Sequence, residues 1–188
     1  MASFTALYDA CVLYPAPLRD LLLQLGTMGL FRARWTDRIH EEWIRSVVAT
    51  RPELAELLAR TRELMNRAVP DCLITGFEAL ESVLELPDQD DRHVLAAAIC
   101  AHAGVIVTYN LKDFPARALA PYHIEAQHPD QFLRHLFDLS PGALCAAVKA
   151  QRQRLKQPPV SAPDILQTFL KLGLSSTVAA LEDMVELI

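Results

Sequence analysis

Four small clusters of acidic or amide side chains stand where an apolar segment of the chain ends or begins. Asp9 follows the apolar segment 4–8, Asp91 precedes the segment 94–99, and Asn110 follows the segment 105–109. These are the positions of a strand end, a helix start and a second strand end, and open α/β sheets bind ligands outside the carboxyl ends of their strands. We therefore expect one site, assembled by folding. The clusters are Asp9, the pair Glu41 and Glu42, the group Asp88, Asp90 and Asp91, and Asn110 with Asp113.

Carboxylates gathered at one edge of a sheet repel each other, because each disfavours the charged form of its neighbours. A hard divalent cation with oxygen ligands, such as Mg²⁺ or Mn²⁺, relieves this repulsion. The clusters therefore predict a metal-dependent enzyme that acts on phosphates.

The order of apolar segments and turn signals predicts an α/β fold. Residues 4–8 and 105–109 have the character of buried strands, with a loop at 9–15 after the first. Residues 72–75 fit either a short strand or a helical turn. The alternation of strands and helices favours a three-layer sandwich with a parallel central sheet. We expect further strands at 83–86 and 123–126, and helices at 17–25, 37–51, 52–66, 90–104 and 131–137.

The pattern changes after residue 140. Residues 143–156 are an alanine-rich helical segment, residues 157–163 are a stiff proline-containing linker, and two short helices are expected at 164–172 and 175–188. A segment of this size cannot easily bury a core of its own, so it should pack on the α/β body or on a partner. We therefore divide the chain into an α/β domain at 1–139 and a C-terminal helical extension at 140–188.

The composition excludes several classes of protein. No apolar run approaches the ~20 residues needed to cross a bilayer, and the first residues lack the basic head of a signal peptide. We expect no membrane span and a cytoplasmic location. With six glycines and no G-x-x-x-x-G-K-[ST] motif, a glycine-rich nucleotide loop is excluded. A zinc site or a disulfide framework is disfavoured because the cysteines are far apart among apolar neighbours: Cys11, Cys72, Cys100 and Cys145.

The net charge of −5 does not favour binding to a polyanion, yet eight arginines lie between Arg32 and Arg67. Guanidinium groups suit bidentate contacts to phosphate. The same segment contains Glu53, Glu56 and Glu63, so a solvated helical face with paired charges explains it equally well. Both interpretations stay open.

Asp9 and Asp91 are the strongest candidates for metal ligands. A carboxylate at the end of a buried strand, such as Asp9, is costly unless it caps the next helix or binds a cation, and we favour the cation. Asp91 lies in the first turn of its helix, on the apolar face, where the helix dipole favours an acid. Asp88 and Asp90 are interpreted as helix caps.

The neighbouring helix positions receive structural interpretations. Glu41 and Glu42 border the apolar stripe of their helix on opposite sides, and either alone is typical of a surface charge. His40 lies along the stripe and is interpreted as a packed core residue. His93 is expected on the exposed side of its helix.

The residues after the second buried strand are the remaining candidates. Thr108, Asn110 and Asp113 offer oxygen atoms that could bind a cation or orient a water molecule. A turn rich in Asn and Asp needs no function to explain it. Their coincidence with Asp9 and Asp91 at matching strand and helix edges favours the functional interpretation.

Four motifs, taken together in their order and spacing, resemble a known family. They are LYDACVLYP at residues 7–15, the segment from Trp35 to Trp43 with its two glutamates, LPDQDDRHVLAAA at 86–98 and VTYNLKDFP at 107–115. Over about residues 3–137 the chain resembles the PIN-domain ribonucleases, and it is most similar to the VapC-type toxins of toxin–antitoxin pairs.

The resemblance implies a metal-dependent endoribonuclease in which Asp9, Glu42, Asp91 and a fourth polar position hold Mg²⁺ or Mn²⁺. Many relatives carry aspartate two residues after the threonine, where this chain has Asn110, and Asp113 is the alternative at that corner. The resemblance also implies an RNA substrate, a small antitoxin that occupies the site, often through an arginine, and a homodimer. Some longer relatives carry a helical extension like residues 140–188.

We expect one or two cations to lower the pKa of a water molecule and to neutralise charge on the scissile phosphate. Asp9 and Asp91 are the principal ligands, Glu42 is a ligand or proton acceptor, and Thr108, Asn110 and Asp113 orient water or phosphate. Two other classes are considered. A phosphoacceptor module of the receiver type needs a lysine after a late strand, which is poorly matched here. A non-catalytic scaffold or protein-binding α/β domain would use the acids as caps.

Overall fold

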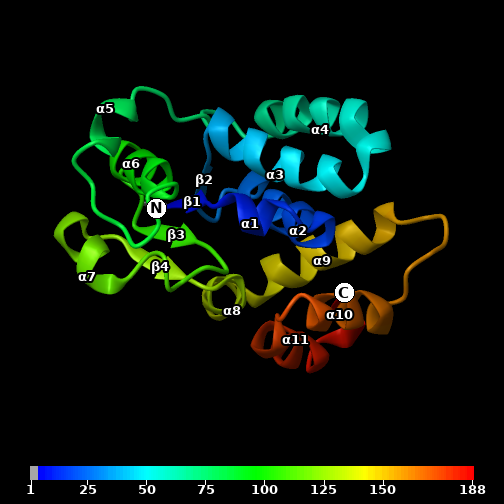
Figure 1. The fold of residues 1–188 in the computed structure, drawn as a ribbon. Helices are drawn as coiled ribbons and strands as arrows, with labels where there is room; N and C mark the ends of the chain where they lie inside the picture. The colour runs from blue at the N-terminus through cyan, green and yellow to red at the C-terminus, as the bar shows by residue number, and fades with distance from the viewer. Residues whose placement is uncertain (1–3) are drawn as a thin grey trace. The chain divides into compact units, whose positions relative to one another are not determined.

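The computed structural model describes residues 4–188, which form two compact units (Figure 1). The first unit contains the described residues up to Tyr14 together with Phe31–His128. The second contains Pro15–Leu30 and Pro129–Ile188. The first unit holds the whole sheet, and the second is helical.

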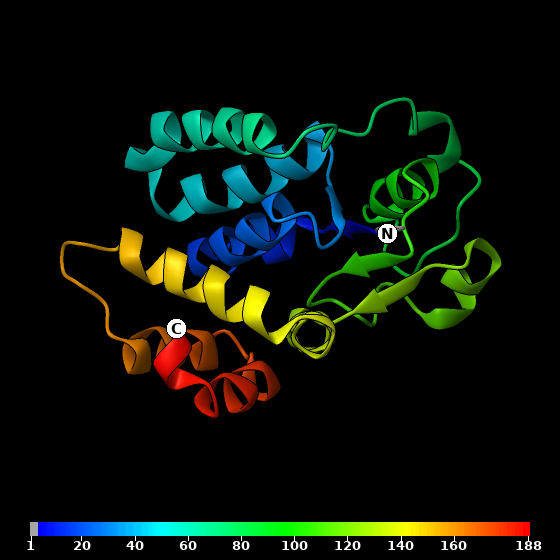
Figure 2. The ribbon, with the colours of Figure 1, turned by 180° about the vertical axis from the view of Figure 1, so that it is seen from behind.

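The sheet has four parallel strands in the order β2-β1-β3-β4. The strands are β1 (Thr5–Tyr8), β2 (Arg32–Arg34), β3 (Val105–Val107) and β4 (Glu125–Gln127), and Figure 2 shows the sheet from behind. Every residue of β1 is buried, as expected for a strand with a neighbour on each side. The strand that follows β1 in the chain, β2, lies on one side of β1, whereas β3 and β4 lie on its other side. The carboxyl ends of β1 and β3 are therefore the topological switch point, where ligands of such sheets bind.

Helix α6 packs on β1 and β3 and carries a run of alanines that permits close approach to the sheet. Helix α3 begins after Thr36, whose hydroxyl accepts a hydrogen bond of 3.1 Å from the Ile39 backbone N–H and so caps the helix. The helical segments of the first unit are α1 (Ala10–Leu13), α3 (Asp37–Thr50), η1 (Pro52–Leu54), α4 (Ala55–Ala68), α5 (Glu78–Glu81), α6 (Arg92–Cys100), α7 (Ala116–Leu119) and η2 (Ala120–Tyr122).

A buried polar network joins α3 to α4 and to the end of β2. Trp43 donates its indole N–H to Nδ1 of His40 at 3.1 Å. Because that nitrogen accepts, the proton of the neutral ring lies on Nε2, which is 2.9 Å from Oδ1 of Asn66. Trp35 donates to the same oxygen at 2.8 Å. The predicted core role of His40 is confirmed, and its satisfied hydrogen bonds hold α3 in one position.

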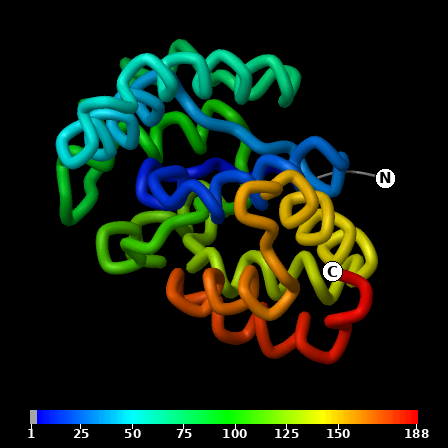
Figure 3. The backbone as a smooth tube through the Cα atoms, turned by 90° about the vertical axis from the view of Figure 1, so that its right-hand side faces the viewer, coloured from blue at the N-terminus to red at the C-terminus, as the bar shows by residue number. Residues whose placement is uncertain are grey.

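The helices of the second unit pack on one another through their apolar faces. On α8 the buried residues Phe132, Leu133, Leu136 and Phe137 recur at helical spacing. This helix packs on α9 and α11, and α2 packs on α9 (Figure 3). Its helical segments are α2 (Ala16–Thr27), α8 (Pro129–Leu139), α9 (Pro141–Arg154), α10 (Ala162–Lys171), α11 (Ser175–Glu182) and η3 (Val185–Leu187).

Polar contacts add to this packing. Arg154 pairs with Asp20 at 2.8 Å, and the amide of Gln151 donates to the Pro17 carbonyl at 2.8 Å. The start of α10 is a capping box in which Ser161 and Asp164 satisfy each other's backbone N–H groups. None of the helices described between Phe4 and Ile188 has the length and apolar character required to span a bilayer.

The predicted α/β class, with a parallel central sheet and C-terminal helices, is confirmed. The sequence patterns missed β2, because this three-residue strand at the sheet edge alternates arginines with one buried alanine. The strand predicted at 83–86 is wrong: Leu84 and Leu86 are buried, but the described segment pairs with no strand. Residues 72–75 contribute one isolated bridge, between Leu73 and Trp35. The loop expected at 9–15 contains the short helix α1.

Helix α8 belongs to the helical unit, so the compact units divide at His128 rather than after Leu139. Residues 15–30 also belong to the helical unit. The division into an α/β domain at 1–139 and a C-terminal helical extension at 140–188 stays a prediction.

Asp130 of α8 accepts hydrogen bonds from the backbone N–H groups of Ser176 and Thr177 at 3.0 and 2.8 Å, at the start of α11. Partial burial acts to raise the pKa of Asp130, but these bonds outweigh it and lower the pKa below 3.8. Asp130→Ala should lower the melting temperature at pH 7 by about 2–4 °C, the shift expected for loss of a cap worth ~1 kcal/mol.

The contribution of Asp130 should vanish as the pH falls from about 4 through the depressed folded-state pKa, because the protonated acid no longer accepts these bonds. Thermal melts of the variant at pH 7 and pH 3 measure this. Asp138→Ala, on the same helix but with one exposed ion pair to Arg134, is the matched control and should change little. Equal losses in the two variants would contradict the capping role.

Candidate active site

A hollow of about 350 Å³ lies at the carboxyl ends of β1 and β3. Three of the predicted acids, from three separate parts of the chain, share its wall: Asp9 after β1, Glu42 on α3 and Asp91 at the start of α6. The remaining lining residues are small, aromatic or amide side chains, and none of the described lining residues is basic. They are Ala10, Cys11, Tyr14, Trp43, Ser46 and Asn110.

Asp9 is held by a hydrogen-bond network across the two strand ends. The Thr108 hydroxyl donates to Oδ2 of Asp9 at 2.7 Å, and the Cys11 thiol donates to the same oxygen at 3.0 Å. The Asn110 backbone N–H in turn donates to the Thr108 hydroxyl oxygen at 2.9 Å. Burial and then the charge of Asp9 raise the pKa of Cys11 to about 12, so the thiol stays a donor rather than a nucleophile. These residues at the ends of β1 and β3 thereby fix the orientation of Asp9. The other carboxylate oxygen of Asp9, Oδ1, has no hydrogen-bond partner among the described residues.

Asp91 experiences uncompensated negative charge. Partial burial raises its pKa first, and the charges of Asp9, Asp88 and Asp113 raise it further, to about 7, against a smaller opposing effect of His93. A carboxyl with an ordinary pKa near 3.8 is therefore only about half ionised at neutral pH when no cation is bound. Such a shift at a hollow marks a functional site.

Glu42 is held from two sides. Nε2 of His93 lies 2.9 Å from Oε1 of Glu42, and Nε of Arg38 lies 3.5 Å from the same oxygen. Arg38 also contacts Glu81 at 3.0 Å. The second carboxylate oxygen of Glu42 has no partner among residues 4–188.

The prediction that His93 lies on the exposed side of its helix is wrong. Its side chain is 1% exposed, because α6 is buried from His93 to Ala98 between the sheet and α5. A helix rich in alanine on every side is a signal of all-round burial that could have identified His93. Its Nδ1 atom is buried without a partner in the described chain.

The other predicted residues divide between the hollow and its surroundings. Asn110 lies in the wall, whereas Asp113 does not line the hollow and acts on Asp91 through its charge. Glu41 lines a different hollow, between α3 and α4. Asp88 accepts a hydrogen bond of 2.9 Å from the Asp90 backbone N–H in the turn before α6. The prediction that Asp88 or Asp90 caps this helix is wrong, because the N-cap residue of α6 is Asp91 and no side chain caps the helix.

The donor set suits a hard cation in its chemistry. Carboxylate and amide oxygens are the ligands that Mg²⁺ and Mn²⁺ prefer, and the negative charge around Asp91 favours binding of a cation. As the side chains stand, no three or more His, Cys, Asp or Glu residues in the described part of the chain are arranged to hold a metal ion. Glu42 is instead engaged by His93 and Arg38, and Asp9 by Thr108 and Cys11, each through one oxygen. Asp9, Glu42 and Asp91 therefore fit a cation by chemistry and location, with one oxygen of Asp9 and of Glu42 free to bind it.

The comparisons with known proteins show the family of the chain. The sequence model of the PIN domain matches residues 5–112, and that of the VapC50 C-terminal domain matches residues 129–183. A Mycobacterium tuberculosis protein named "Putative ribonuclease VapC50" is 47% identical over 79 residues, which are 42% of this chain and 47% of that protein. The match thus spans about half the length of the relative. No solved structure matches the chain significantly.

The charge on Asp91 should destabilise the metal-free protein at alkaline pH. Its folded-state pKa of about 7 exceeds the ordinary 3.8, so the folded protein binds more protons in this window and loses stability as the pH rises through it. In EDTA, Asp91→Asn should therefore melt about 2–4 °C above wild type at pH 8, a gain discounted for the partial exposure of the group. The gain should shrink towards pH 4.

Asp90→Asn is the matched control for this experiment. It removes the same charge one residue away, from an exposed side chain outside the hollow, and should leave the melting temperature nearly unchanged at both pH values. A stabilisation of equal size in both variants would show that the effect comes from net charge rather than from the hollow.

Proposed function

The chain belongs to the PIN domain family, and we propose from this that it is a metal-dependent endoribonuclease, the toxin of a VapBC-type pair. The observation that carries the proposal is the convergence of Asp9, Glu42 and Asp91 on one hollow, with the pKa of Asp91 raised to about 7. The name of the M. tuberculosis relative supports a ribonuclease.

Asp9, Asp91 and Glu42 would hold Mg²⁺ or Mn²⁺, with Asn110 as the fourth group in the wall and Asp113 as the alternative. The bound cation would supply a water molecule of lowered pKa and neutralise charge developing on the phosphate. Neighbouring side chains orient part of this site in the absence of the cation. Asp9 is oriented before any ligand binds, because Thr108 and Cys11 fix one of its oxygens.

Glu42 combines two possible tasks, binding the cation and accepting a proton. Its position depends on His93 and Arg38, which engage the same oxygen. The side-chain amide of exposed Asn110 could donate to a phosphate oxygen at the mouth of the hollow.

The arginine-rich segment 32–67 contributes less free positive charge than its composition indicates. Arg51 and Arg62 pair with acids, Arg38 pairs with Glu42 and Glu81, and Arg34 donates to the Asp71 carbonyl. The ion pairs favour the interpretation of paired charges for three of the eight arginines, Arg38, Arg51 and Arg62.

The biological setting belongs to the proposal as well. A toxin of this type acts on cellular RNA in the cytoplasm, is restrained by a small cognate antitoxin protein and forms a homodimer. The match of residues 129–183 to the VapC50 C-terminal domain supports a toxin with a helical extension, such as α8–α11.

The test is cleavage of single-stranded RNA by purified protein in Mn²⁺, in Mg²⁺ and in EDTA. Wild type should cut only with a cation, and Asp9→Asn and Asp91→Asn should each lose on the order of 100-fold or more in rate. Asp90→Asn should cut like wild type. Equal cutting by wild type and the Asp91 variant, or cutting in EDTA, would contradict the proposed site.

His93 is proposed as a positioning residue for Glu42. His93→Leu removes the donor and should lower the rate about 10- to 100-fold, the range seen when groups that orient metal ligands are removed. The loss should be partly recovered at high Mn²⁺ concentration, since a misplaced Glu42 weakens cation binding. His93→Gln retains a donor and should keep more activity. An unchanged Mn²⁺ requirement in both folded variants would assign His93 a packing role only.

A further inference from the structure

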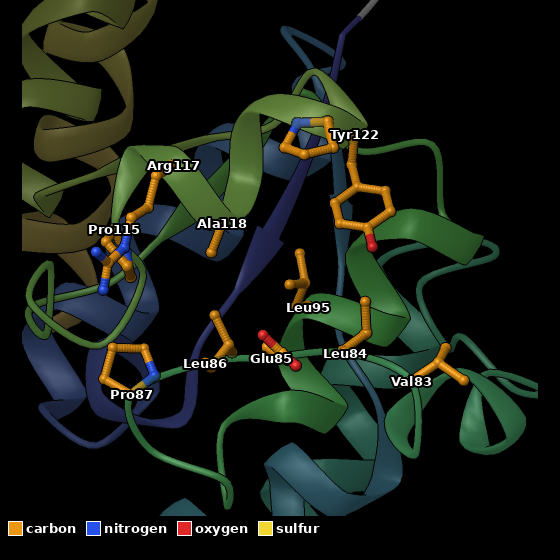
Figure 4. A pocket seen from close by; sticks show the side chains of 11 residues that line it. Val83, Leu84, Glu85, Leu86, Pro87, Leu95, Pro115, Arg117, Ala118 and Tyr122 are labelled. Atoms are coloured by element: carbon orange, nitrogen blue, oxygen red, sulfur yellow. The ribbon is translucent and has the colours of Figure 1, made fainter.

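A second hollow in the first unit has the features of a binding site that the proposed chemistry does not use. It encloses about 620 Å³, within the usual range for small-ligand sites. One wall is the segment 83–87, the other is formed by residues of the segment 115–122, and Leu95 of α6 contributes to its floor. Figure 4 shows the side chains of Arg117 and Tyr122 near opposite ends of this hollow, with Glu85 on the facing wall.

Three side chains give this hollow its chemistry. Tyr122 is 41% exposed, so part of its aromatic ring is available to a ligand. Glu85 and Arg117 are exposed, and neither forms an ion pair within residues 4–188. Leu84 and Leu86 are buried beneath and make the wall apolar. An aromatic ring, a carboxylate and a guanidinium over an apolar wall are the groups that contact an unpaired nucleotide.

The chain itself places this hollow beside the candidate active site. Leu95 lies four residues after Asp91 on the same face of α6, a rise of about 6 Å. Pro115, in the opposite wall, lies two residues after Asp113, at most ~7.6 Å away along the backbone. Residues of both walls of this hollow thus lie within a few residues of Asp91 and Asp113, and we expect an RNA strand bound at the acids to reach it with a neighbouring nucleotide.

We propose that this hollow binds an unpaired base of the RNA next to the scissile phosphate and selects guanine; the inference rests on the proposed ribonuclease function. The Tyr122 ring stacks on the base, and Arg117 contacts the neighbouring phosphate. Glu85 would repel a phosphate but accepts hydrogen bonds from a base edge. Guanine presents two adjacent N–H donors to such a carboxylate, which can accept both.

Binding is tested separately from cleavage, in EDTA, by fluorescence anisotropy of labelled oligouridines that carry one guanosine, one inosine or one adenosine. Wild type should bind the guanosine oligomer about tenfold more tightly than the adenosine oligomer, with inosine between them because it lacks the exocyclic amine. Glu85→Gln should abolish this preference, because it removes the carboxylate that accepts both guanine donors. Tyr122→Ala should weaken binding of all three oligomers, since stacking does not distinguish bases, and Tyr122→Phe, which retains the ring, should keep the affinity.

Arg117→Ala should weaken binding of all three oligomers alike, since a phosphate contact carries no base information. Arg60→Ala removes another exposed arginine, outside the hollow, and serves as the matched control. All variants are compared by thermal melting to exclude unfolding. Equal affinity of wild type for the three oligomers, an unchanged preference in folded Glu85→Gln, or an unchanged affinity in folded Tyr122→Ala overturns the inference.

Cleavage-site mapping in Mn²⁺ separates this inference from the proposed function. Cleavage by wild type next to guanosines, with the preference lost in Glu85→Gln, supports both. If wild type and Glu85→Gln cleave with the same sequence preference, the guanine site is rejected, whereas the proposed ribonuclease function is supported. If wild type prefers guanosine in binding but shows no metal-dependent cleavage, the base-binding hollow is supported and the proposed ribonuclease function is rejected.

Discussion

Mutual repulsion of carboxylates at the joined ends of β1 and β3 is the constraint on which the rest of the structure depends. Asp9, Asp91 and Asp113 come from different parts of the chain, yet they lie close together: partial burial raises the pKa of Asp91 first, and the charges of Asp9, Asp88 and Asp113 raise it further, to about 7. A fold selected only for stability would separate such charges or pair each with a base. Here the hydrogen bond from Thr108 to Asp9 and the burial of α6 hold them together.

The supporting framework is polar and buried as well as apolar. The network of His40, Asn66, Trp35 and Trp43 holds α3 in place, and α3 carries Glu42 to the hollow. His93 connects Glu42 to α6, the helix that begins beside Asp91. Asp9 and Glu42 are thus held by side chains of the elements that form the core, so this part of the site is ordered before a ligand arrives. Helix α6 also connects the acids to the second hollow, at Tyr122, because Leu95 of this helix lines that hollow.

Local patterns predicted the parts of this arrangement that depend on single segments. A buried strand followed by an acid located Asp9, and an acid before an alanine-rich helix located Asp91. The interpretation of His93 failed because helical periodicity assumes one exposed face, whereas α6 is covered by the sheet and by α5. Strand β2 was missed because its arginines point to a solvated segment, and its hydrogen bonds exist only through pairing with β1.

The order of apolar and acidic segments by itself determined the α/β class and the parallel sheet and made Asp9 and Asp91 candidates, because burial periodicity and turn chemistry are local properties. The choice of Glu42 over Glu41 came from the family resemblance. Tertiary structure decided which groups meet. It formed the hydrogen bond from Thr108 to Asp9 and the contact of His93 with Glu42, and it placed Asn110 rather than Asp113 in the wall of the active-site hollow. It also grouped residues 15–30 with the C-terminal helices. Such contacts join residues remote in the chain, and their distances follow from packing, which no single segment encodes.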